Sequence, residues 1–444
     1  MKTIRENKST PFYYNLCIAM IWLIVFYSSI IQYKVREIPY GMLILGIAIV
    51  VFYFLHSSGK PYNIHEQLTE ESIWMILFMV YMFSIGTLFA IKRTSHFSQS
   101  INSLQYLFVM VIMASLIKGS GTDSFHIMLL IKAIVLAVIF ILNPVYYEAD
   151  RYSISRDLNP NGLGMAFATG IWAAFYLQQK RKLPIILLFA LIAIFGFCIF
   201  QTGSRKSLVA AGLTIVLWFL FCYLPEIKHK GAFSIVISFL FIIVLLIFVG
   251  WVFTGLYAGS TISNRMNRLF YETTEGNRSQ MYRAGLDMIK TNPLFGIGFT
   301  GFEAIYGLYS HATIVEIPVS GGVVGAIIYF YAYFVSIKKT FCLYRKTKGA
   351  RESMQAHNKI KMIMILWATM LFYCTCIIHQ YQFDSFIIFG IIFGETSFIE
   401  KTISDKLAHS NSKEIGMRYI IPSNKKEIYK KTTIGSKYFN YGKD

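Results

Sequence analysis

Charged residues are scarce in this chain. Aspartate, glutamate, lysine and arginine together make up 15% of its 444 residues, whereas 55% are hydrophobic and 16% are aromatic, and the mean hydropathy is +0.52. Soluble globular domains carry about 25% charged residues. This shortage excludes an ordinary soluble protein and indicates a chain that crosses a membrane many times.

Cysteine is also rare, and its spacing does not suit metal binding or disulfides. The six cysteines lie in or beside apolar runs, so we expect them to be small core residues. The chain lacks the patterns HExxH, GxxxxGK[ST] and GxSxG. These absences remove the sequence signals for a zinc hydrolase, a phosphate-binding loop and an α/β-hydrolase nucleophile, and we predict no metal and no cofactor.

Long apolar runs, in contrast, are abundant. Runs of roughly 17 to 25 residues, the length that crosses a bilayer as a helix, predict about twelve transmembrane helices. The predicted spans are 12–31, 38–56, 73–91, 101–118, 125–142, 162–179, 183–201, 207–224, 232–257, 311–335, 361–379 and 383–398. We predict an all-α fold: a polytopic helical bundle in residues 1–398, with one large external loop at about 258–310, followed by a basic cytoplasmic tail at 399–444.

Basic residues in short loops mark the cytoplasmic side of a membrane protein. They gather in the connections 1–11, 179–182, 226–230 and 338–351. With twelve helices these connections share one face, so both termini are expected in the cytoplasm. The external face then receives the connections 143–161, 202–206, 258–310 and 379–384. The net charge of +19 is explained by cytoplasmic anchoring against anionic membrane lipid, and we predict no nucleic-acid binding.

Arginines at external helix entrances are not explained by this rule. In "QTGSRKSLVAAG" (201–212), Arg205 stands at the start of a predicted helix, after Thr202 and Ser204 as candidate N-caps. A cation at this position opposes the helix dipole. A bound anion would instead be attracted by the dipole, the backbone N–H groups and the guanidinium together. Two interpretations stay open: anion binding, or an arginine that reaches lipid phosphates.

The segment "EGNRSQMYRAGLDMIKTNPLFGIGF" (275–299) repeats this pattern. Asn277 is expected to cap a short amphipathic helix at about 278–290, which ends before the Asn-Pro pair. Arg278 lies in its first turn and is the better candidate for ligand contact. Arg283 lies further along, where a solvated surface arginine is the alternative.

A third entrance lies in "EADRYSISRDLNPNGLGMAFATG" (148–170). Arg156 precedes a helix that Asn161 is expected to cap, with Pro160 making the approach rigid. Arg156 can also simply pair with a neighbouring aspartate. Three arginine-bearing entrances indicate a shared anionic ligand near the outer leaflet, and diphosphate fits because it offers several acceptor oxygens to forked donors.

Two histidines and a buried acid complete the candidate site. His311, at the mouth of the predicted span 311–335, can act as a base and then as an acid, or can be an interfacial histidine bonded to a carbonyl. Glu316 lies too deep to be an unpaired charge, and we expect it to orient His311 or to pair with an arginine. His379 lies in a polar external connection that suits sugar contacts. Gly321 and Gly325, at GxxxG spacing, predict a close helix approach.

These segments resemble the O-antigen ligase and O-antigen polymerase family of bacterial membrane proteins. The resemblance covers about 150 to 335. It rests on "TGSRKSLVAA" (202–211), "NRSQMYRAGLDMIKTNPLFGIGF" (277–299) and "SHATIVEIPVSGGVVGAI" (310–327), with "NPN" (159–161) upstream. Where family members commonly carry asparagine after the histidine, this chain has Ala312.

The resemblance implies a metal-independent glycosyltransferase without a cofactor, on the outer face of the bacterial inner membrane. Its donor would be a glycan on an undecaprenyl-diphosphate carrier, and its acceptor a lipid-linked repeat unit or a lipopolysaccharide core. Arg205 and Arg278 would bind the diphosphate, and His311 would act on the acceptor hydroxyl. A chain-length regulator is an expected partner of a polymerase. The residues expected to bind substrate are Arg156, Asn161, Asn277, Arg283, Glu316 and His379.

Our first hypothesis is therefore a polymerase of O-antigen, capsule or exopolysaccharide, and the second is an O-antigen ligase. A transporter of lipid-linked oligosaccharide is the alternative from another class. Transporters tend to show internal repeats and ionisable groups at the membrane midplane. The sequence has no clear repeat and few such groups beyond Lys132 and Glu316, which favours an enzyme.

Overall fold

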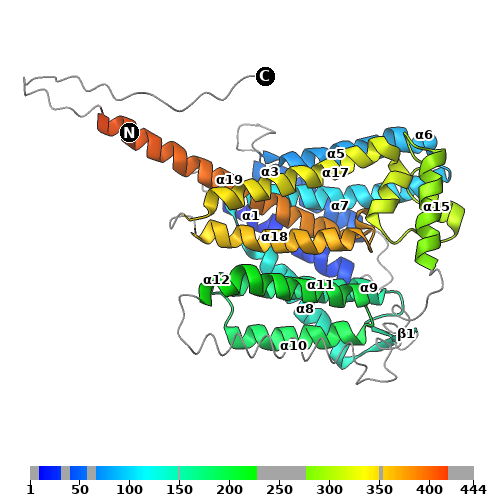
Figure 1. Cartoon of the computed structure of the whole chain (residues 1–444), viewed down its shortest axis with the longest axis horizontal. Helices are drawn as coiled ribbons and strands as arrows, with labels where there is room; N and C mark the ends of the chain where they lie inside the picture. The colour runs from blue at the N-terminus through cyan, green and yellow to red at the C-terminus, as the bar shows by residue number, and fades with distance from the viewer. Residues whose placement is uncertain are drawn as a thin grey trace, which may run out of the picture. The chain divides into compact units, whose positions relative to one another are not determined.

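A computed structural model describes most of the chain (Figure 1). The described residues are 10–31, 41–57, 67–148, 151–227, 277–349 and 354–418. The chain divides into a helical body, residues 1–400, and a second unit, residues 401–444. The contacts described below all lie within the helical body.

Helices make up nearly all of the described structure. The main helices are α1 (Thr10–Phe26), α3 (Gly41–Ser57), α5 (Glu70–Tyr81), α7 (Arg93–Ser120), α8 (Ser124–Leu142), α9 (Pro160–Gln179), α10 (Ile185–Gln201), α11 (Arg205–Trp218), α15 (Asn277–Thr291), α17 (Thr313–Thr347), α18 (Met354–Cys374) and α19 (Phe383–Arg418). The short elements are the π-helical turns η1 (Tyr27–Ile31), η2 (Met82–Gly86) and η3 (Phe219–Tyr223), the 3-10 turn η5 (His379–Tyr381), the helices α6 (Thr87–Phe89), α12 (Leu224–Ile227) and α16 (Gly301–Tyr306), and the strands β1 (Val145–Glu148) and β2 (Arg151–Ser153).

The predicted all-α membrane fold is confirmed. Each predicted span except 232–257 coincides with a described helix, and 232–257 lies outside the described residues. Within the described part of the chain, six helical segments are long and apolar enough to cross a membrane, and α3 and α10 are apolar but shorter. The protein is therefore a multi-pass membrane protein.

A small β-hairpin marks one end of the bundle and was not predicted. In the predicted external connection 143–161, β1 and β2 pair antiparallel, with Tyr146 opposite Tyr152. We call this end the hairpin end. Because the connections reverse the chain, it also carries the starts of α9, α11 and α17 and the turn after α18. Figure 1 shows β1 and α15 at this same end.

The helix α17 is broken at Gly322, which has a left-handed backbone (φ 62°, ψ −165°). Residues 293–298 fill the break: the Ile297 and Gly298 N–H groups donate to the Val319 and Ser320 carbonyls, both at 2.9 Å. In return, the Val323 N–H donates to the carbonyl of Pro293 at 2.8 Å. The loop therefore satisfies backbone groups that the break in α17 exposes.

The predicted amphipathic helix is confirmed as α15, and it packs across the start of α17. Its apolar face contributes Met281 and Met288 to a buried cluster with Ile297, Phe302 and Val319. This contact fixes α15 beside α17 at the hairpin end.

The predicted close helix approach also occurs. A Cβ atom added at Gly325 would lie 2.8 Å from the Tyr81 ring of α5. The Tyr81 hydroxyl donates to the Gly321 carbonyl at 2.6 Å, next to the break. The helix α5 therefore supports the broken part of α17 from its other side.

We predict that Gly322→Ala destabilises the protein. A Cβ atom at this position would lie 2.3 Å from the Leu294 carbonyl group, so the inserted loop would have to move in addition to the backbone strain of about 1 to 3 kcal/mol. Gly307→Ala is the matched control, because Gly307 also has a positive φ (85°) but has open space around it. Thermal unfolding of the detergent-purified protein should show a clearly larger loss for Gly322→Ala. Equal melting temperatures for the two variants would contradict the role of the inserted loop.

Candidate functional site

The turn that follows α18 connects three helices from different parts of the sequence. Its consecutive backbone carbonyls each accept a hydrogen bond from a different helix. The donors are Tyr282 of α15 (3.1 Å to the Thr375 oxygen), Lys206 of α11 (3.1 Å to the Cys376 oxygen) and Thr313 of α17 (2.6 Å to the Ile377 oxygen). The starts of α11 and α17 and the first half of α15 are therefore held at one place. These segments carry Arg205, Arg278 and His311, the residues that the sequence analysis predicts to be catalytic.

Arg205 is the first residue of α11, as the sequence predicts, and its side chain is half-buried. Ser204 is the N-cap residue, but its side chain does not cap the helix. Its hydroxyl instead pairs with the Ser207 hydroxyl at 2.9 Å. The Ser204 side chain thus leaves the first N–H groups of α11 uncapped, and such groups at a helix start suit an anion.

Arg278 lies in the first turn of α15, which begins at Asn277. The side chains of these two residues lie outside the described part of the chain. Tyr282, one turn further along, makes the bond to the turn after α18. Arg283 is exposed. Through Tyr282, the first half of α15 is therefore held close to the turn that follows α18.

His311 precedes α17 rather than lying within it, because the helix begins two residues later at Thr313. Its backbone is left-handed (φ 60°), a conformation that costs energy for a non-glycine residue and tends to occur at functional sites. Its half-buried ring lies 4.1 Å from the Tyr309 ring, measured between centroids. Ser310 holds the turn through a hydrogen bond from its hydroxyl to the Ala312 carbonyl at 3.1 Å.

Glu316 fixes the same turn from inside the protein. Its buried carboxylate accepts hydrogen bonds from the Ser310 N–H at 3.2 Å and from the Tyr381 hydroxyl at 3.0 Å. No arginine or lysine among the described residues forms an ion pair with it, so the expected arginine pairing is not found there. Glu316 therefore positions the segment that carries His311.

Tyr381 links this carboxylate to the loop before α16. Its hydroxyl also accepts a hydrogen bond from the Thr300 N–H at 3.0 Å. Burial, followed by the charge of Glu316, raises the pKa of Tyr381 well above its usual value. The hydroxyl stays protonated at neutral pH and remains a donor to Glu316.

The entrance to α9 differs from the prediction. Asn159, rather than Asn161, is the N-cap, and its side chain accepts from the Asn161 N–H at 2.9 Å. The Asn161 side chain accepts a hydrogen bond from Arg151 at 3.1 Å, and Arg151 also donates to the Thr202 carbonyl at 3.0 Å. Arg151 therefore ties the hairpin to the starts of α9 and α11. Arg156 is exposed and makes no hydrogen bond or ion pair with the described residues.

His379 is completely buried, which does not fit the expected contact with a sugar. Its Nδ1 atom lies 2.7 Å from the Tyr333 hydroxyl, and its backbone N–H donates to Thr313 at 2.8 Å. His379 supports the start of α17 from the interior, and we do not include it among the residues that face substrate.

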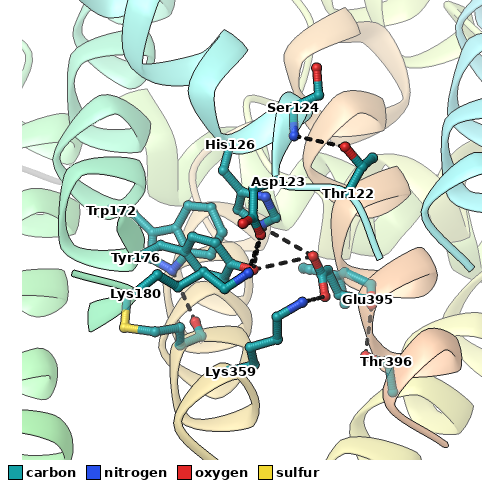
Figure 2. Close-up of polar contacts among 12 residues, drawn as sticks. Thr122, Asp123, Ser124, His126, Trp172, Tyr176, Lys180, Lys359, Glu395 and Thr396 are labelled. Carbon is teal, nitrogen blue, oxygen red and sulfur yellow. Dashed lines mark hydrogen bonds and ion pairs between the residues drawn. The ribbon is translucent and has the colours of Figure 1, made fainter. Parts of the chain in front are cut away.

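A second polar cluster lies beside the start of α8, away from the hairpin end, and Figure 2 shows its polar contacts. Asp123, His126 and Glu395 place candidate ligand atoms within 4.8 Å of one another. The His126 ring stacks on Tyr176 at 3.7 Å between centroids, and both of its buried nitrogens lack a hydrogen bond. By spacing alone, these three residues can hold a metal ion.

Lysines already neutralise the carboxylates of this cluster. Lys180 and Lys182 bind Asp123, and Lys359 binds Glu395 at 3.0 Å. Burial would raise the pKa of Asp123, but hydrogen bonds from the two lysines outweigh it and keep this pKa well below its usual value. A divalent cation would have to displace ammonium groups here. We interpret the cluster as a set of ion pairs that joins the α7–α8 loop, α9, α18 and α19.

Comparison with known proteins supports the resemblance seen in the sequence. Residues 189–330 match a family model described as O-antigen ligase. The matched region contains Arg205, Arg278, His311 and Glu316 but ends before the turn that follows α18. A search of curated proteins finds no match. The family match supports a role in surface polysaccharide biosynthesis of the O-antigen ligase or polymerase type.

We predict that Lys359→Met destabilises the protein by about 3 to 5 kcal/mol, because it leaves the buried Glu395 carboxylate without its cation. The double variant Lys359→Met/Glu395→Leu should recover most of this loss, as measured by thermal unfolding. Lys290→Met is the control, since the ion pair of Lys290 with Asp287 is exposed and should contribute about 1 kcal/mol or less. One equivalent of metal in the purified wild type that is lost in His126→Ala would overturn the ion-pair interpretation.

Proposed function

We propose that this protein polymerises a surface polysaccharide, such as O-antigen, capsule or exopolysaccharide. In this proposal it transfers glycan from an undecaprenyl-diphosphate carrier to a lipid-linked repeat unit at the outer face of the bacterial inner membrane. The main support is the turn after α18, whose three carbonyls hold the start of α11, the first half of α15 and the start of α17 together.

The proposed reaction needs charge stabilisation and one base. The acceptor hydroxyl oxygen forms a bond to the anomeric carbon of the donor sugar. The bond from that carbon to the diphosphate oxygen breaks, and undecaprenyl diphosphate leaves with the electron pair. The protein has to bind the diphosphate charge, hold the acceptor in line and take up one proton.

In this reaction Arg205 and Arg278 bind the diphosphate, assisted by the positive ends of α11 and α15. Both guanidinium groups offer forked donors that match phosphate oxygens. Arg156, Arg283, Asn161 and Asn277 are proposed to contact the glycan or the carrier around this pair. Their positions at or near the helix entrances of the hairpin end support this assignment.

His311 is proposed to take the proton from the acceptor hydroxyl. Its left-handed turn is held by the hydrogen bond from the Ser310 hydroxyl to the Ala312 carbonyl. Glu316 also holds the turn, because it accepts hydrogen bonds from the Ser310 N–H and from the Tyr381 hydroxyl. Such a turn holds the imidazole in a defined place before substrate binds, which lowers the cost of reaching the transition state.

An O-antigen ligase is the second candidate, and the description of the matching family model favours it. A ligase would use the same donor and the same arginines but would transfer the glycan to the lipopolysaccharide core. The basic connections predict that the hairpin end is external and that both termini are cytoplasmic, which would expose the site to acceptors outside the cell.

The deciding experiment is a gel profile of surface polysaccharide and lipid-linked glycan from cells that lack the protein. Complementation with Arg205→Ala, Arg278→Ala or His311→Ala should give single repeat units without a ladder, because each variant loses the diphosphate clamp or the base. Arg345→Ala, an exposed arginine at the other end of α17, is the matched control and should restore the ladder.

Each outcome of this profile separates the hypotheses. Long polymer that accumulates on the carrier without reaching the core would identify a ligase instead. A full ladder from Arg205→Ala at normal protein level would contradict the proposal that Arg205 binds the diphosphate. An unchanged profile in cells that lack the protein would argue against both functions.

We predict that EDTA leaves transfer by the purified protein unchanged, because arginines rather than a cation are proposed to neutralise the diphosphate. The measurement is product formed from lipid-linked donor, with and without chelator. Activity that disappears with EDTA and returns only with added Mg²⁺ or Mn²⁺ would contradict the proposed mechanism.

A further inference from the structure

A cavity of about 500 Å³ lies at the hairpin end. Its walls come from η1, α3, α7, α8, the start of α9 and residues 381–384. This volume falls within the range of about 300 to 1,000 Å³ that is usual for small-molecule sites. The polar side chains that line it are Asn102, Gln105, Tyr106, Lys132, Gln382 and Asp384.

The cavity reaches into the membrane-spanning part of the protein. Lys132 lies ten residues before the hairpin-end terminus of α8 at Leu142, which is about 15 Å along the helix. Both α7 and α8 are apolar enough to span a membrane. Polar groups at this depth are costly unless they have partners or a function.

A partly buried ion pair lies in this lining. Lys132 donates to the Asp384 Oδ1 atom at 2.5 Å, and the two side chains are 3% and 24% exposed. The second carboxylate oxygen of Asp384 has no protein partner in the described part of the chain. The pair makes the cavity electrically neutral while it leaves a strong acceptor available to a ligand.

The carboxamides in the cavity have no partners of their own. The side chains of Asn102, Gln105 and Gln382 make no hydrogen bond with the protein, as far as the structure describes it. Each carboxamide offers two donors and a carbonyl acceptor. Donors and acceptors are therefore present together, beside the aromatic ring of Tyr106 and apolar residues such as Leu136 and Phe383.

This lining suits a saccharide better than the alternatives. A lipid chain would leave the carboxamides and the ion pair without partners. A phosphate would need a net positive charge, but Asp384 already neutralises Lys132. Sugar hydroxyls donate and accept at once, and the apolar faces of sugar rings pack on aromatic and aliphatic side chains.

The cavity also adjoins the proposed catalytic segments. Tyr381 lines it, and the hydroxyl of this residue bonds to Glu316, which fixes the turn that carries His311. Gly162 lines it from the start of α9, next to Asn161, which binds Arg151. A saccharide in the cavity would therefore lie close to the place where the reaction is proposed to occur.

We infer that this cavity binds one or more sugar residues of the glycan substrates. Gln105, Gln382 and the second carboxylate oxygen of Asp384, which does not bind Lys132, hydrogen-bond to sugar hydroxyls. Lys132 is a positioning residue that holds Asp384. This inference rests on the proposed function. The bound sugar belongs either to the donor glycan, next to its diphosphate, or to the acceptor glycan.

The test measures binding of a defined probe to the full-length protein in nanodiscs. The probe is the repeat-unit oligosaccharide released by mild acid from the lipid-linked pool of the host. Gln105→Leu and Gln382→Leu should each weaken binding by about tenfold or more, because buried hydroxyls lose a partner. Gln178→Leu, at the opposite end of α9, is the matched control and should bind like the wild type.

Folding is controlled separately. Lys132→Met alone is avoided because it leaves Asp384 without its cation, whereas the glutamine variants remove no charge and should unfold at the wild-type temperature. Wild-type protein that does not bind the probe, or Gln105→Leu and Gln382→Leu variants that bind it normally, would overturn the inference.

Two modified probes identify which sugar is bound. Borohydride opens the ring at the reducing end, which lies next to the diphosphate in the donor, whereas an exoglycosidase removes the non-reducing sugar, which receives the new bond in the acceptor. Loss of binding after the first treatment assigns the cavity to the donor, and loss after the second assigns it to the acceptor.

Failure of this inference can be told apart from failure of the proposed function. Arg205→Ala should bind the oligosaccharide normally, since the probe lacks diphosphate, although it should not make polymer. Normal polymer from Arg205→Ala together with weakened binding in Gln105→Leu would refute the proposed diphosphate clamp and leave the sugar site standing.

Discussion

The backbone of a membrane protein has to satisfy its own polar groups, because lipid offers them no hydrogen bonds. At the hairpin end this constraint determines where irregular segments can lie. The break at Gly322 exposes carbonyls of α17, and the loop 293–298 supplies N–H groups to two of them, those of Val319 and Ser320. Because α15 precedes this loop directly, the loop fixes where the arginine-bearing helix can lie.

The same constraint explains why the apolar segment 310–330 begins with polar groups. Glu316 is buried, but its carboxylate has two donors, Ser310 and Tyr381. Its carboxyl oxygens are therefore hydrogen-bonded, in part by the turn that they hold, and that turn carries His311 in a left-handed conformation. A single buried carboxylate in this way connects the stability of the helix start with the placement of the candidate base.

The sequence predicts the helices well, because apolar length is a local property that every span displays on its own. It also predicts the arginines at helix starts and the amphipathic helix α15. The hairpin was missed because its strands are only a few residues long, and the wrong asparagine was chosen as the cap of α9 because both flank Pro160. The burial of His379 and the pairing of Lys132 with Asp384 depend on contacts across the fold, which local patterns do not encode.

The turn after α18 shows why some of the site is invisible to any sequence pattern. It binds Tyr282, Lys206 and Thr313 through backbone carbonyls, and every amino acid supplies a backbone carbonyl. The side chains of the turn are therefore free to vary without loss of these acceptors. The matched region ends before this turn, yet the relative placement of its arginine-bearing and histidine-bearing segments depends on it. The proposed chemistry needs those segments at fixed separations. The turn after α18, which acts through its backbone and therefore leaves no sequence pattern, is thus part of the proposed catalytic site.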